Sequence, residues 1–537
     1  MSTPSGKSTL RSSMPVTVAV MVSRILGVVR DAVFLALFPI WMTDAFRVAF
    51  QIPNLLRDLF AEGALSSAFV PTFASTLEKE GRKRAHLLAN RMIMAVTLVV
   101  GSLMVLGLLF PEPVVALISG EFAGDQRKVE LTVALTRWMM PILLLVSLGA
   151  VFMGMLNAEG RFVTPAFAPA LFNVTSIGFG GAIWLWHSDP DRGLWWFTIG
   201  TVAAALVQTG IQIPSLWRTG YRPSIALGIW RDPGVRRIAR LMAPAVIGLA
   251  AVQVNVFVNT RFASALGDGP VTYLSNAFRL FYLPIGLFGV ALATVTTTRV
   301  SQDAARGDRA ALSNRTAEGL SAVWMLALPS GIGLILLSEP IVAMLFKWGR
   351  FSHEGVVATS DVLRMYMLGV VPYSLVKSLV PGFYAIDRPR IPMIASMTAV
   401  AVNVAFNALM YRELGAPGLA LGTTLAATVN YLVLRIAFAR VIGPLPLHDV
   451  AAGGRLRRLV ALGLASATMV AVILSCLYAG NGLVGMGRTA NAAALFVTIA
   501  VAFLGYAVVL GAMGYPGAKA LVGIPRKIVG RLRGRRG

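Results

Sequence analysis

Residues 23–31 read S-R-I-L-G-V-V-R-D, and residues 43–63 read T-D-A-F-R-V-A-F-Q-I-P-N-L-L-R-D-L-F-A-E-G. Both stretches lie in apolar segments that are long enough to cross a bilayer, yet both carry several charges. A single Arg or Asp at the centre of a membrane helix costs about 2.5–3.5 kcal/mol on insertion scales. We therefore expect these charges to be paired with one another or to serve a function.

The polar residues of each stretch fall on one side of the expected helix. At about 100° per residue, those of the first stretch occupy an arc of about 120°, and apolar residues fill the rest. The second stretch clusters similarly, although Pro53 is expected to kink its helix. Polar stripes of this kind are stable when they face a water-filled cavity. The first stripe comprises Ser23, Arg24, Gly27, Arg30 and Asp31, and the second comprises Asp44, Arg47, Gln51, Asp58 and Glu62.

The composition identifies a polytopic membrane protein. Of 537 residues, 56% are hydrophobic and only 13% are charged, and the mean hydropathy is +0.72, which no soluble domain of this length requires. A single cysteine, Cys476, excludes an intramolecular disulfide and a cysteine metal cluster. The net charge of +24 is interpreted as a topology signal and an attraction to anionic lipid rather than to nucleic acid.

About fourteen apolar spans follow one another, each longer than the ~20 residues that a crossing helix needs. Cations are concentrated in the even-numbered connections and in the C-terminal tail, so the positive-inside rule predicts that both termini are cytoplasmic. The first span is interpreted as an uncleaved membrane segment. The spans are 14–38, 43–76, 89–110, 129–157, 163–186, 193–215, 238–264, 270–300, 315–338, 357–385, 391–411, 416–441, 456–479 and 490–516.

Short motifs recur along the chain at offsets of about 222 to 232 residues. Residues 45–47 and 277–279 both read A-F-R, and residues 200–201 and 422–423 both read G-T. Together these matches predict two six-segment halves that form a parallel repeat about an axis along the membrane normal. We expect an N-terminal lobe over residues 1–219, a C-terminal lobe over 220–443, and two extra helices with a basic cytoplasmic tail over 444–537.

Two such halves would enclose a central cavity, and its expected lining is rich in arginine. The guanidinium group presents a planar fork of donors that suits phosphate and carboxylate oxygens. The cavity therefore favours an anionic cargo. The first two segments contribute Arg24, Arg30, Arg47 and Arg57, and the second half contributes Arg279 and Lys377.

A simpler interpretation is that the arginines pair with acidic neighbours and lock helices together. The adjacent residues Arg30 and Asp31 fit this view, as do Arg57 and Asp58, but it explains Arg24 and Arg279 less well because neither has an acidic neighbour. The other acidic residues, Asp44 and Glu62, fit gate or pairing roles better than cargo binding. We interpret Arg137 and Arg364 as snorkelling or locally paired.

At this point the sequence resembles the MurJ (MviN) family. The matching runs are S-R-I-L-G-V-V-R-D, T-D-A-F-x-V-A-F-x-I-P-N-L-L-R and F-A-E-G-A-x-S-x-A-F-V-P, all within the first 75 residues. Further matches extend the likeness over roughly residues 14–440: residues 164–169 with Asn173, residues 289–292, Leu345 and Phe346 with Gly349 and Phe351, and residues 381–384.

The resemblance implies a lipid II flippase of the multidrug/oligosaccharidyl-lipid/polysaccharide exporter superfamily, with fourteen helices and two halves. Such a protein moves the undecaprenyl-diphosphate-linked disaccharide-pentapeptide precursor of peptidoglycan between leaflets, and its last two helices are thought to hold the lipid tail. The family's cavity arginines fall on Arg24, Arg30, Arg57 and Arg279, and its functional acidic positions fall on Asp31, Asp44 and Glu62. We group Ser23, Asp31, Asp44, Arg47, Glu62 and Lys377 as gate or charge-pairing residues.

The sequence departs from the family pattern at several cavity positions. Arg47 stands where an aromatic residue is usual, Gln51 where a basic one is expected, and Asp58 where arginine is frequent; Tyr282 replaces an acidic residue. These changes move charge around the cavity. Sodium coordination, proposed for some members, has no acidic constellation here.

The resemblance further implies a multi-pass protein of the bacterial inner membrane, expected to be a monomer and to need no cofactor. The cargo's diphosphate carries about two negative charges, and moving them outward across ~100 mV is favourable by roughly 4–5 kcal/mol. Alternating access driven partly by membrane potential is the resulting hypothesis, with the coupling ion left open. If the rate of transport in vesicles did not change with an imposed potential of either sign, the hypothesis that membrane potential drives transport would be excluded.

Three other functions are alternatives for a chain of this kind. A glycosyltransferase or phosphatase acting on a lipid-linked sugar would place a carboxylate near a loop, as Asp44 does, but no Asp-x-Asp, phosphatase motif or metal-ligand cluster accompanies it. An exporter of drugs or of another lipid-linked glycan is the main alternative, although an arginine-rich cavity argues against drugs. A channel is disfavoured because no pore-loop signature occurs.

Overall fold

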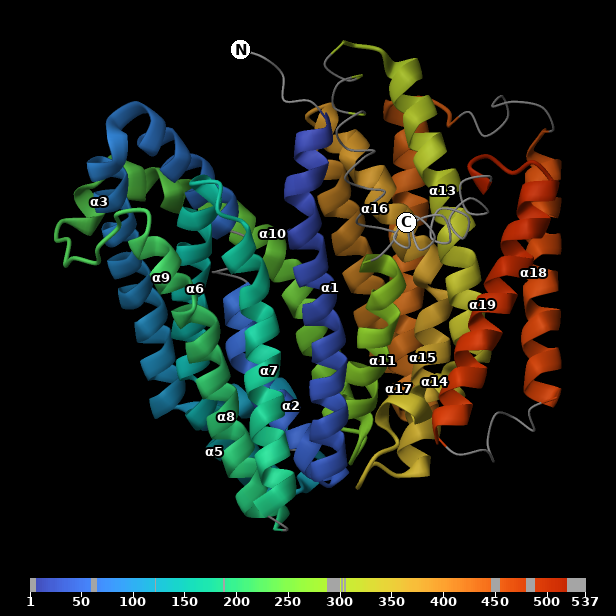
Figure 1. The fold of residues 1–537 in the computed structure, drawn as a ribbon, viewed down its shortest axis with the longest axis horizontal. Coiled ribbons are helices and arrows are strands. Elements are labelled where there is room, and N and C mark those ends of the chain that lie inside the picture. Colours follow the sequence, from blue (N-terminus) through green and yellow to red (C-terminus); the bar gives the residue numbers. More distant parts are fainter. Residues whose placement is uncertain are drawn as a thin grey trace, which may run out of the picture. The chain divides into compact units, whose positions relative to one another are not determined.

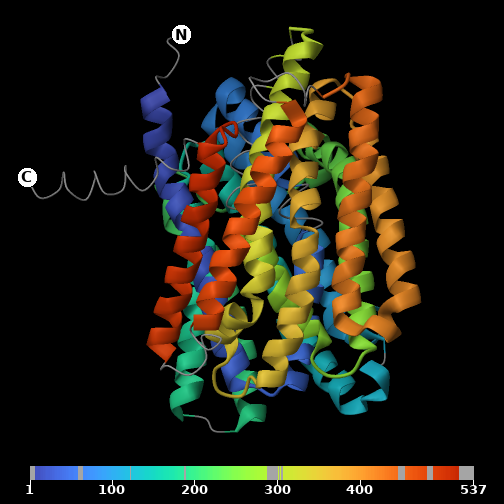
Figure 2. The same ribbon diagram turned by 90° about the vertical axis from the view of Figure 1, so that its right-hand side faces the viewer.

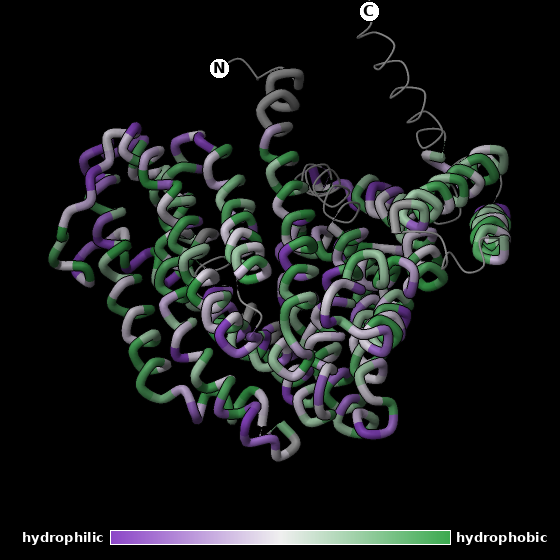
Figure 3. Tube along the Cα trace, turned by 60° about the horizontal axis from the view of Figure 1, so that its bottom comes forward, coloured by the Kyte–Doolittle hydropathy of each residue, from purple (hydrophilic) through white to green (hydrophobic). Residues whose placement is uncertain are grey.

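The computed structural model describes residues 6–58, 65–120, 122–186, 189–286, 300, 303, 306–445, 454–479 and 488–518. Every regular element in these ranges is helical, and no β-strand occurs among them. Eight of the described helical segments are long and apolar enough to cross a membrane. Figure 3 shows hydrophobic residues along most of the helix lengths, with hydrophilic residues gathered towards helix ends and connections. An all-α polytopic fold is thus confirmed, and the number of fourteen transmembrane helices stays a prediction.

The chain divides into two compact units. The first comprises Met1–Thr272 and Leu345–Phe351, and the second comprises Tyr273–Met344 and Ser352–Gly537. The predicted lobe boundaries at residues 219 and 443 stay a prediction. Most of the helices are labelled in Figure 1. In the first unit they are α1 (Gly6–Leu37), α2 (Ile40–Arg57), α3 (Ser66–Leu109), α4 (Pro111–Ser119), α5 (Gln126–Met139), α6 (Pro141–Ala158), α7 (Val163–Trp186), α8 (Pro190–Gly210), α9 (Gln212–Trp217) and α10 (Pro233–Ser264).

The second unit begins within α11 (Pro270–Pro284), since Thr272 is the last residue of the first unit before the chain crosses. Its two C-terminal helices, α18 (Gly454–Ala479) and α19 (Arg488–Ala512), run side by side in Figures 1 and 2 and pack on α13 (Arg309–Leu336). The phenol groups of Tyr506 and Tyr515 donate to backbone carbonyls of α13, at 3.1 and 3.0 Å. The remaining helices are α14 (Ser338–Phe346), α15 (His353–Leu368), α16 (Val370–Ala385) and α17 (Arg390–Val441).

The order of elements recurs along the chain. Each unit contains a short helix, α4 or α14, followed by a broken pair of helices, α5–α6 or α15–α16. Both α3 and α17 are interrupted by one glycine in a non-helical conformation, Gly81 at φ 82° and Gly415 at φ 59°. Only glycine adopts such positive φ angles without a steric penalty. This recurrence is what the predicted internal repeat requires.

Several helices begin at side-chain caps. The carboxylates of Asp125, Asp189, Asp232 and Asp308 accept backbone N–H groups at the starts of α5, α8, α10 and α13. Such caps satisfy donors that the first helical turn would otherwise leave unpaired. In α8 and α10 a proline follows the cap directly, which fixes φ at the first helical position. The polar loops of the sequence thus set where these helices start.

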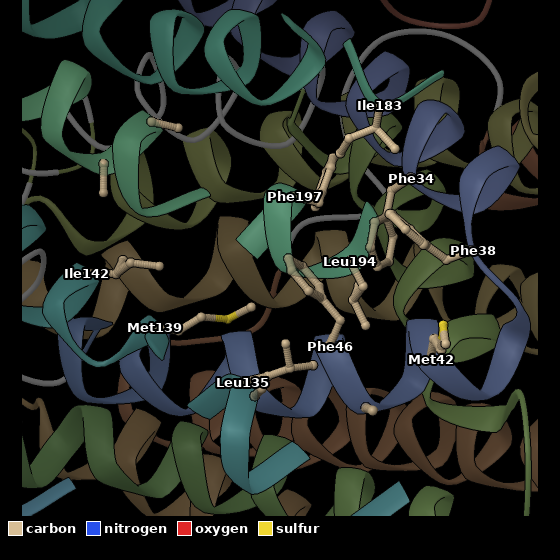
Figure 4. Close-up of a cluster of buried hydrophobic side chains, with 14 of the residues drawn as sticks. Phe34, Phe38, Met42, Phe46, Leu135, Met139, Ile142, Ile183, Leu194 and Phe197 are labelled. Atoms are coloured by element: carbon tan, nitrogen blue, oxygen red, sulfur yellow. The ribbon is translucent and has the colours of Figure 1, made fainter. Parts of the chain in front are cut away.

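An aromatic core holds α1 and α2 in place within the first unit (Figure 4). The Phe34 ring of α1 lies 4.6 Å from that of Phe46 in α2 and 5.0 Å from that of Phe197 in α8, between centroids. Phe38, Met42 and residues of α5 complete the cluster. Because buried aromatic side chains dominate core energetics, this cluster fixes the helices that carry the charged stripes.

Candidate functional site

The stripe on α1 contains a buried charge cluster. The guanidinium of Arg30 donates to Asp31 Oδ1 through Nε at 3.2 Å and Nη2 at 2.9 Å. Asp31 is only 4% exposed, and Arg47 Nη2 of α2 lies 3.9 Å from its other carboxylate oxygen. One carboxylate therefore lies between two guanidinium groups, so the predicted pairing of Arg30 with Asp31 is present and Arg47 joins it across helices.

The Arg30 guanidinium also lies 5.6 Å from the centroid of the Phe172 ring in α7. The next residue, Asn173, donates from Nδ2 to the backbone carbonyl of Ser23 at 3.0 Å. A face of an aromatic ring attracts a cation, and an amide bonded to a neighbouring backbone fixes helix register. The segment 164–173, which the sequence singled out, thus supports the α1 stripe.

Arg24 differs from its neighbours on the stripe. Its side chain is half-buried, and within the described part of the chain it makes neither a hydrogen bond nor an ion pair. A half-buried guanidinium without a counter-charge retains all five of its donors for a ligand. Among the predicted cargo-binding residues of the first unit, Arg24 therefore makes the fewest polar contacts with the described part of the protein.

Two of the departures, Gln51 on α2 and Asp58 directly after it, contact α10. The Gln51 side chain hydrogen-bonds the hydroxyl of Thr260 at 2.8 Å, and Asp58 Oδ2 accepts from Gln253 Nε2 at 3.3 Å. Asp58 also forms an ion pair with Arg57, in which Arg57 Nη2 lies 2.7 Å from Asp58 Oδ1. The neutral amide at position 51 and the acid at position 58 thus form contacts with α10 within the first unit. Local sequence could not predict these contacts, because their partners are distant in the chain.

Asp44 sits in a fully buried network where α2 starts. Its carboxylate accepts the backbone N–H groups of Gly269 at 2.7 Å and Thr272 at 2.8 Å, and the Thr272 hydroxyl at 2.6 Å. Lys128 Nζ of α5, itself 1% exposed, donates to Asp44 at 3.1 Å and to Asp268 at 2.8 Å. Asp44 therefore ties α2 and α5 to the start of α11, which agrees with a pairing role.

Lys128 is a site residue that sequence reasoning missed. It lies in the connection that contains Glu121 and Asp125, and no sequence motif singles it out. Its ammonium lies 4.7 Å from the centroid of the Phe122 ring. One sequence signal could have identified it: helix-forming residues follow the Asp125 cap. They predict that Lys128 lies in the first turn of a helix, where its backbone N–H donates to Asp125.

The motif L-F-x-x-G-x-F forms a clasp on the end of α1. Arg350 donates its backbone N–H to the carbonyl of Ala36 at 3.0 Å. Gly349 has φ +53°, and a Cβ added there would lie 2.2 Å from the same carbonyl oxygen. Phe346 and Phe351 are buried on either side. The clasp, residues 345–351, needs glycine for both its conformation and its close approach.

The second unit holds the remaining predicted residues. Arg279 is half-buried on α11, and Lys377 on α16 donates to the Tyr282 hydroxyl at 3.3 Å. The shared chamber predicted for Arg24, Arg30, Arg57 and Arg279 stays a prediction, because Arg279 belongs to the second unit. Glu62 lies outside the described residues.

Another ion cluster anchors α10 within the first unit. The fully buried carboxylate of Asp232 caps α10 and accepts from Arg84 Nη1 at 2.7 Å and from Arg91 of the same helix, α3. Burial alone would raise the pKa of Asp232, but hydrogen bonds from the two arginines and from the N–H groups of Gly234 and Val235 outweigh it and lower the pKa to about 2.

Replacing Asp232 by Ala is expected to lower the free energy of unfolding by about 3 kcal/mol, since it removes a helix cap and two ion pairs. The exposed cap of α13, Asp308, serves as control, and its replacement by Ala should cost about 1 kcal/mol.

Because folding lowers the pKa of Asp232, its contribution is present above pH ~4 and is lost as the pH falls towards about 2. Thermal unfolding of the purified protein at several pH values measures this; equal losses for both variants would contradict it.

Comparisons with solved structures define the class of protein. A lipid II flippase MurJ in an inward closed conformation superposes with a TM-score of 0.76 at 24% identity, over 92% of this chain and 97% of that chain. An inward-facing multidrug resistance transporter of the MATE family, in the MOP superfamily, superposes with a TM-score of 0.64 at 18% identity, over 78% of this chain and 94% of that one. The chain thus shares its fold with these two proteins.

Sequence comparison then gives the family. The model of the lipid II flippase MurJ family matches residues 35–486. A probable lipid II flippase MurJ of Bdellovibrio bacteriovorus is 34% identical over 511 residues, which cover 94% of this chain and 95% of the relative. This chain belongs to the MurJ family, as its motifs predicted. It is therefore a multi-pass protein of the bacterial inner membrane and a transporter, and the rival prediction of a glycosyltransferase or phosphatase is excluded.

Proposed function

We propose that this protein moves lipid II from the inner to the outer leaflet of the bacterial cytoplasmic membrane by alternating access. Membership of the lipid II flippase family over residues 35–486 is the observation that carries the proposal. The two compact units provide the two bodies that such a mechanism requires. An exporter of drugs would need fewer arginines at these positions, so no second function is favoured.

Cargo binding is assigned to Arg24, Arg30, Arg57 and Arg279. Arg24 supports this assignment most directly, because it is half-buried without a partner among the described residues. Arg30 is paired with Asp31, and the planar fork of its guanidinium suits a diphosphate oxygen. The wider roles of Ser23, Asp31, Arg47 and Glu62 remain those of positioning and charge balance around the arginines.

Asp44 is assigned to the gate. We place both termini in the cytoplasm, as the distribution of cations predicts, so the ends of α1 and the start of α2 lie at the outer surface. Opening this end would separate Asp44 from Gly269 and Thr272. The hydrogen bonds from these two residues to Asp44 keep the start of α11 against α2. The same orientation puts the basic tail on anionic lipid headgroups, and we treat the protein as a monomer.

Complementation tests the proposed function. The full-length chain, expressed in a bacterium depleted of its own lipid II flippase, should restore growth and cell-wall synthesis. Export of lipid II to the outer leaflet would be read in the same cells by its accessibility to an externally added enzyme that cleaves the diphosphate. A protein that reaches the membrane but leaves lipid II inaccessible would refute the proposal.

A further inference from the structure

Lys377 occupies an aromatic box in the second unit. Its ammonium lies 5.0 Å from the centroid of the Tyr282 ring and 5.5 Å from that of Tyr373, and it donates to the Tyr282 hydroxyl at 3.3 Å. Tyr282 comes from α11, while Tyr373 and Lys377 lie one turn apart on α16. Two ring faces and a phenol oxygen thus hold one end of a flexible side chain in place.

The box is rigid because it belongs to a larger aromatic cluster. Phe281 packs against Tyr373 with centroids 5.4 Å apart, and against the buried Tyr366 of α15 at 5.5 Å. Phe278 contacts Tyr282 at 5.5 Å and is 38% exposed, so the cluster runs from the protein interior to an accessible edge. Aromatic side chains have few rotatable bonds, so a cation placed against them loses little further freedom when it binds a ligand.

The charge of Lys377 is not balanced within the box. Within the described part of the chain its contacts are those with the two tyrosines, and no carboxylate lies within ion-pair distance of it. An ammonium has three N–H donors and the Tyr282 oxygen accepts one. The side chain is half-buried, and an anion bound by the other donors in such a partly desolvated setting would be held more strongly than in water.

We propose that Lys377 and its tyrosine box form an oxyanion-binding subsite that contacts a phosphate or carboxylate group of the transported lipid. The inference rests on the proposed function and deepens it, because it makes Lys377 a cargo ligand rather than a gate residue. A structural ion pair would need an acidic neighbour, whereas ring faces stabilise the cation without neutralising it. The cargo's diphosphate and its peptide carboxylates offer the same chemistry, and the experiment separates them.

Binding to the purified full-length protein tests the proposal with three probes: undecaprenyl diphosphate, lipid II, and lipid II whose peptide carboxylates are methylated. Lys377→Met should weaken lipid II binding on the order of tenfold, as expected for one charge-assisted contact. Tyr282→Glu should weaken it similarly by giving Lys377 an internal counter-charge, while Lys377→Arg and Tyr282→Phe should bind within about threefold of the wild type. Arg412, an exposed cation paired with Tyr411, is the matched control, and Arg412→Met should change nothing.

The pattern across the probes identifies the oxyanion. Equal weakening for all three probes assigns Lys377 to the diphosphate, and weakening confined to unmethylated lipid II assigns it to the peptide. Wild-type affinity of folded Lys377→Met for every probe, or tighter binding by Tyr282→Glu, overturns the subsite. Failure of the wild type to bind lipid II would instead overturn the proposed function, and Lys377-dependent binding of undecaprenyl diphosphate alone would keep the subsite while rejecting that function.

Discussion

Arg24→Ala is expected to abolish rescue of a flippase-depleted bacterium while the protein still reaches the membrane. Arg24 makes no hydrogen bond or ion pair with the described residues, so its removal should change the free energy of unfolding by less than about 0.5 kcal/mol. Loss of transport without loss of stability would show that the side chain acts on the cargo. Growth, membrane abundance and thermal unfolding of the same variant are the measurements.

Arg30→Ala and Arg279→Ala are expected to abolish rescue as well, and Arg30→Ala should also lower the stability of the protein. Removing Arg30 leaves the buried Asp31 with Arg47 at 3.9 Å, so a stability loss accompanies any loss of binding. Arg24→Lys separates charge from shape, because lysine lacks the bidentate fork and should restore only part of the activity. Arg137, which is half-exposed and paired with Glu112, is the control, and Arg137→Ala should rescue fully. Rescue by all three alanine variants would remove the arginines from the cargo site.

Asp44→Ala is expected to cost about 3–5 kcal/mol of unfolding free energy, the loss typical of a broken buried ion pair. The change orphans the N–H groups of Gly269 and Thr272 and leaves Lys128 buried with less compensation. Lys128→Met should cost clearly less, because Asp44 retains both backbone donors and the Thr272 hydroxyl, and Asp268 is half-exposed to water. The two costs are therefore unequal although the residues are partners.

Thermal unfolding of both variants in detergent measures this asymmetry, together with rescue in cells. Arg127, the exposed neighbour of Lys128 that stacks on Trp41 at 4.3 Å, provides the control, and Arg127→Met should cost less than about 1 kcal/mol. If Lys128→Met proved as damaging as Asp44→Ala, the backbone donors would contribute little and the ion pair would dominate.

The sequence predicted features that depend on local pattern. The pairing of Arg30 with Asp31 follows from adjacency, and the interruptions at Gly81 and Gly415 fall in connections between predicted spans. Some spans proved to be two helices, such as 357–385, which breaks at Gly369 into α15 and α16. Hydropathy does not mark such a break, because the apolar run continues through Gly369 on both sides.

Contacts between distant segments could not be predicted in this way. Gln51 and Thr260 are 209 positions apart, and Lys128 and Asp44 are 84 apart. The packing of α10 on α3 and α4 depends on surfaces that no single stretch encodes. The family resemblance identified which charges matter, but their partners became visible only in three dimensions.

The clasp of residues 345–351 has a mechanical consequence. The backbone leaves the second unit after Met344, is fixed to α1 at Ala36, and returns at Ser352. Because Gly349 leaves no room to slide against the Ala36 carbonyl, this segment behaves as a tether anchored on one body. Rocking of the two bodies during transport would therefore be absorbed by torsions at the residues flanking the tether, which makes these positions hinges.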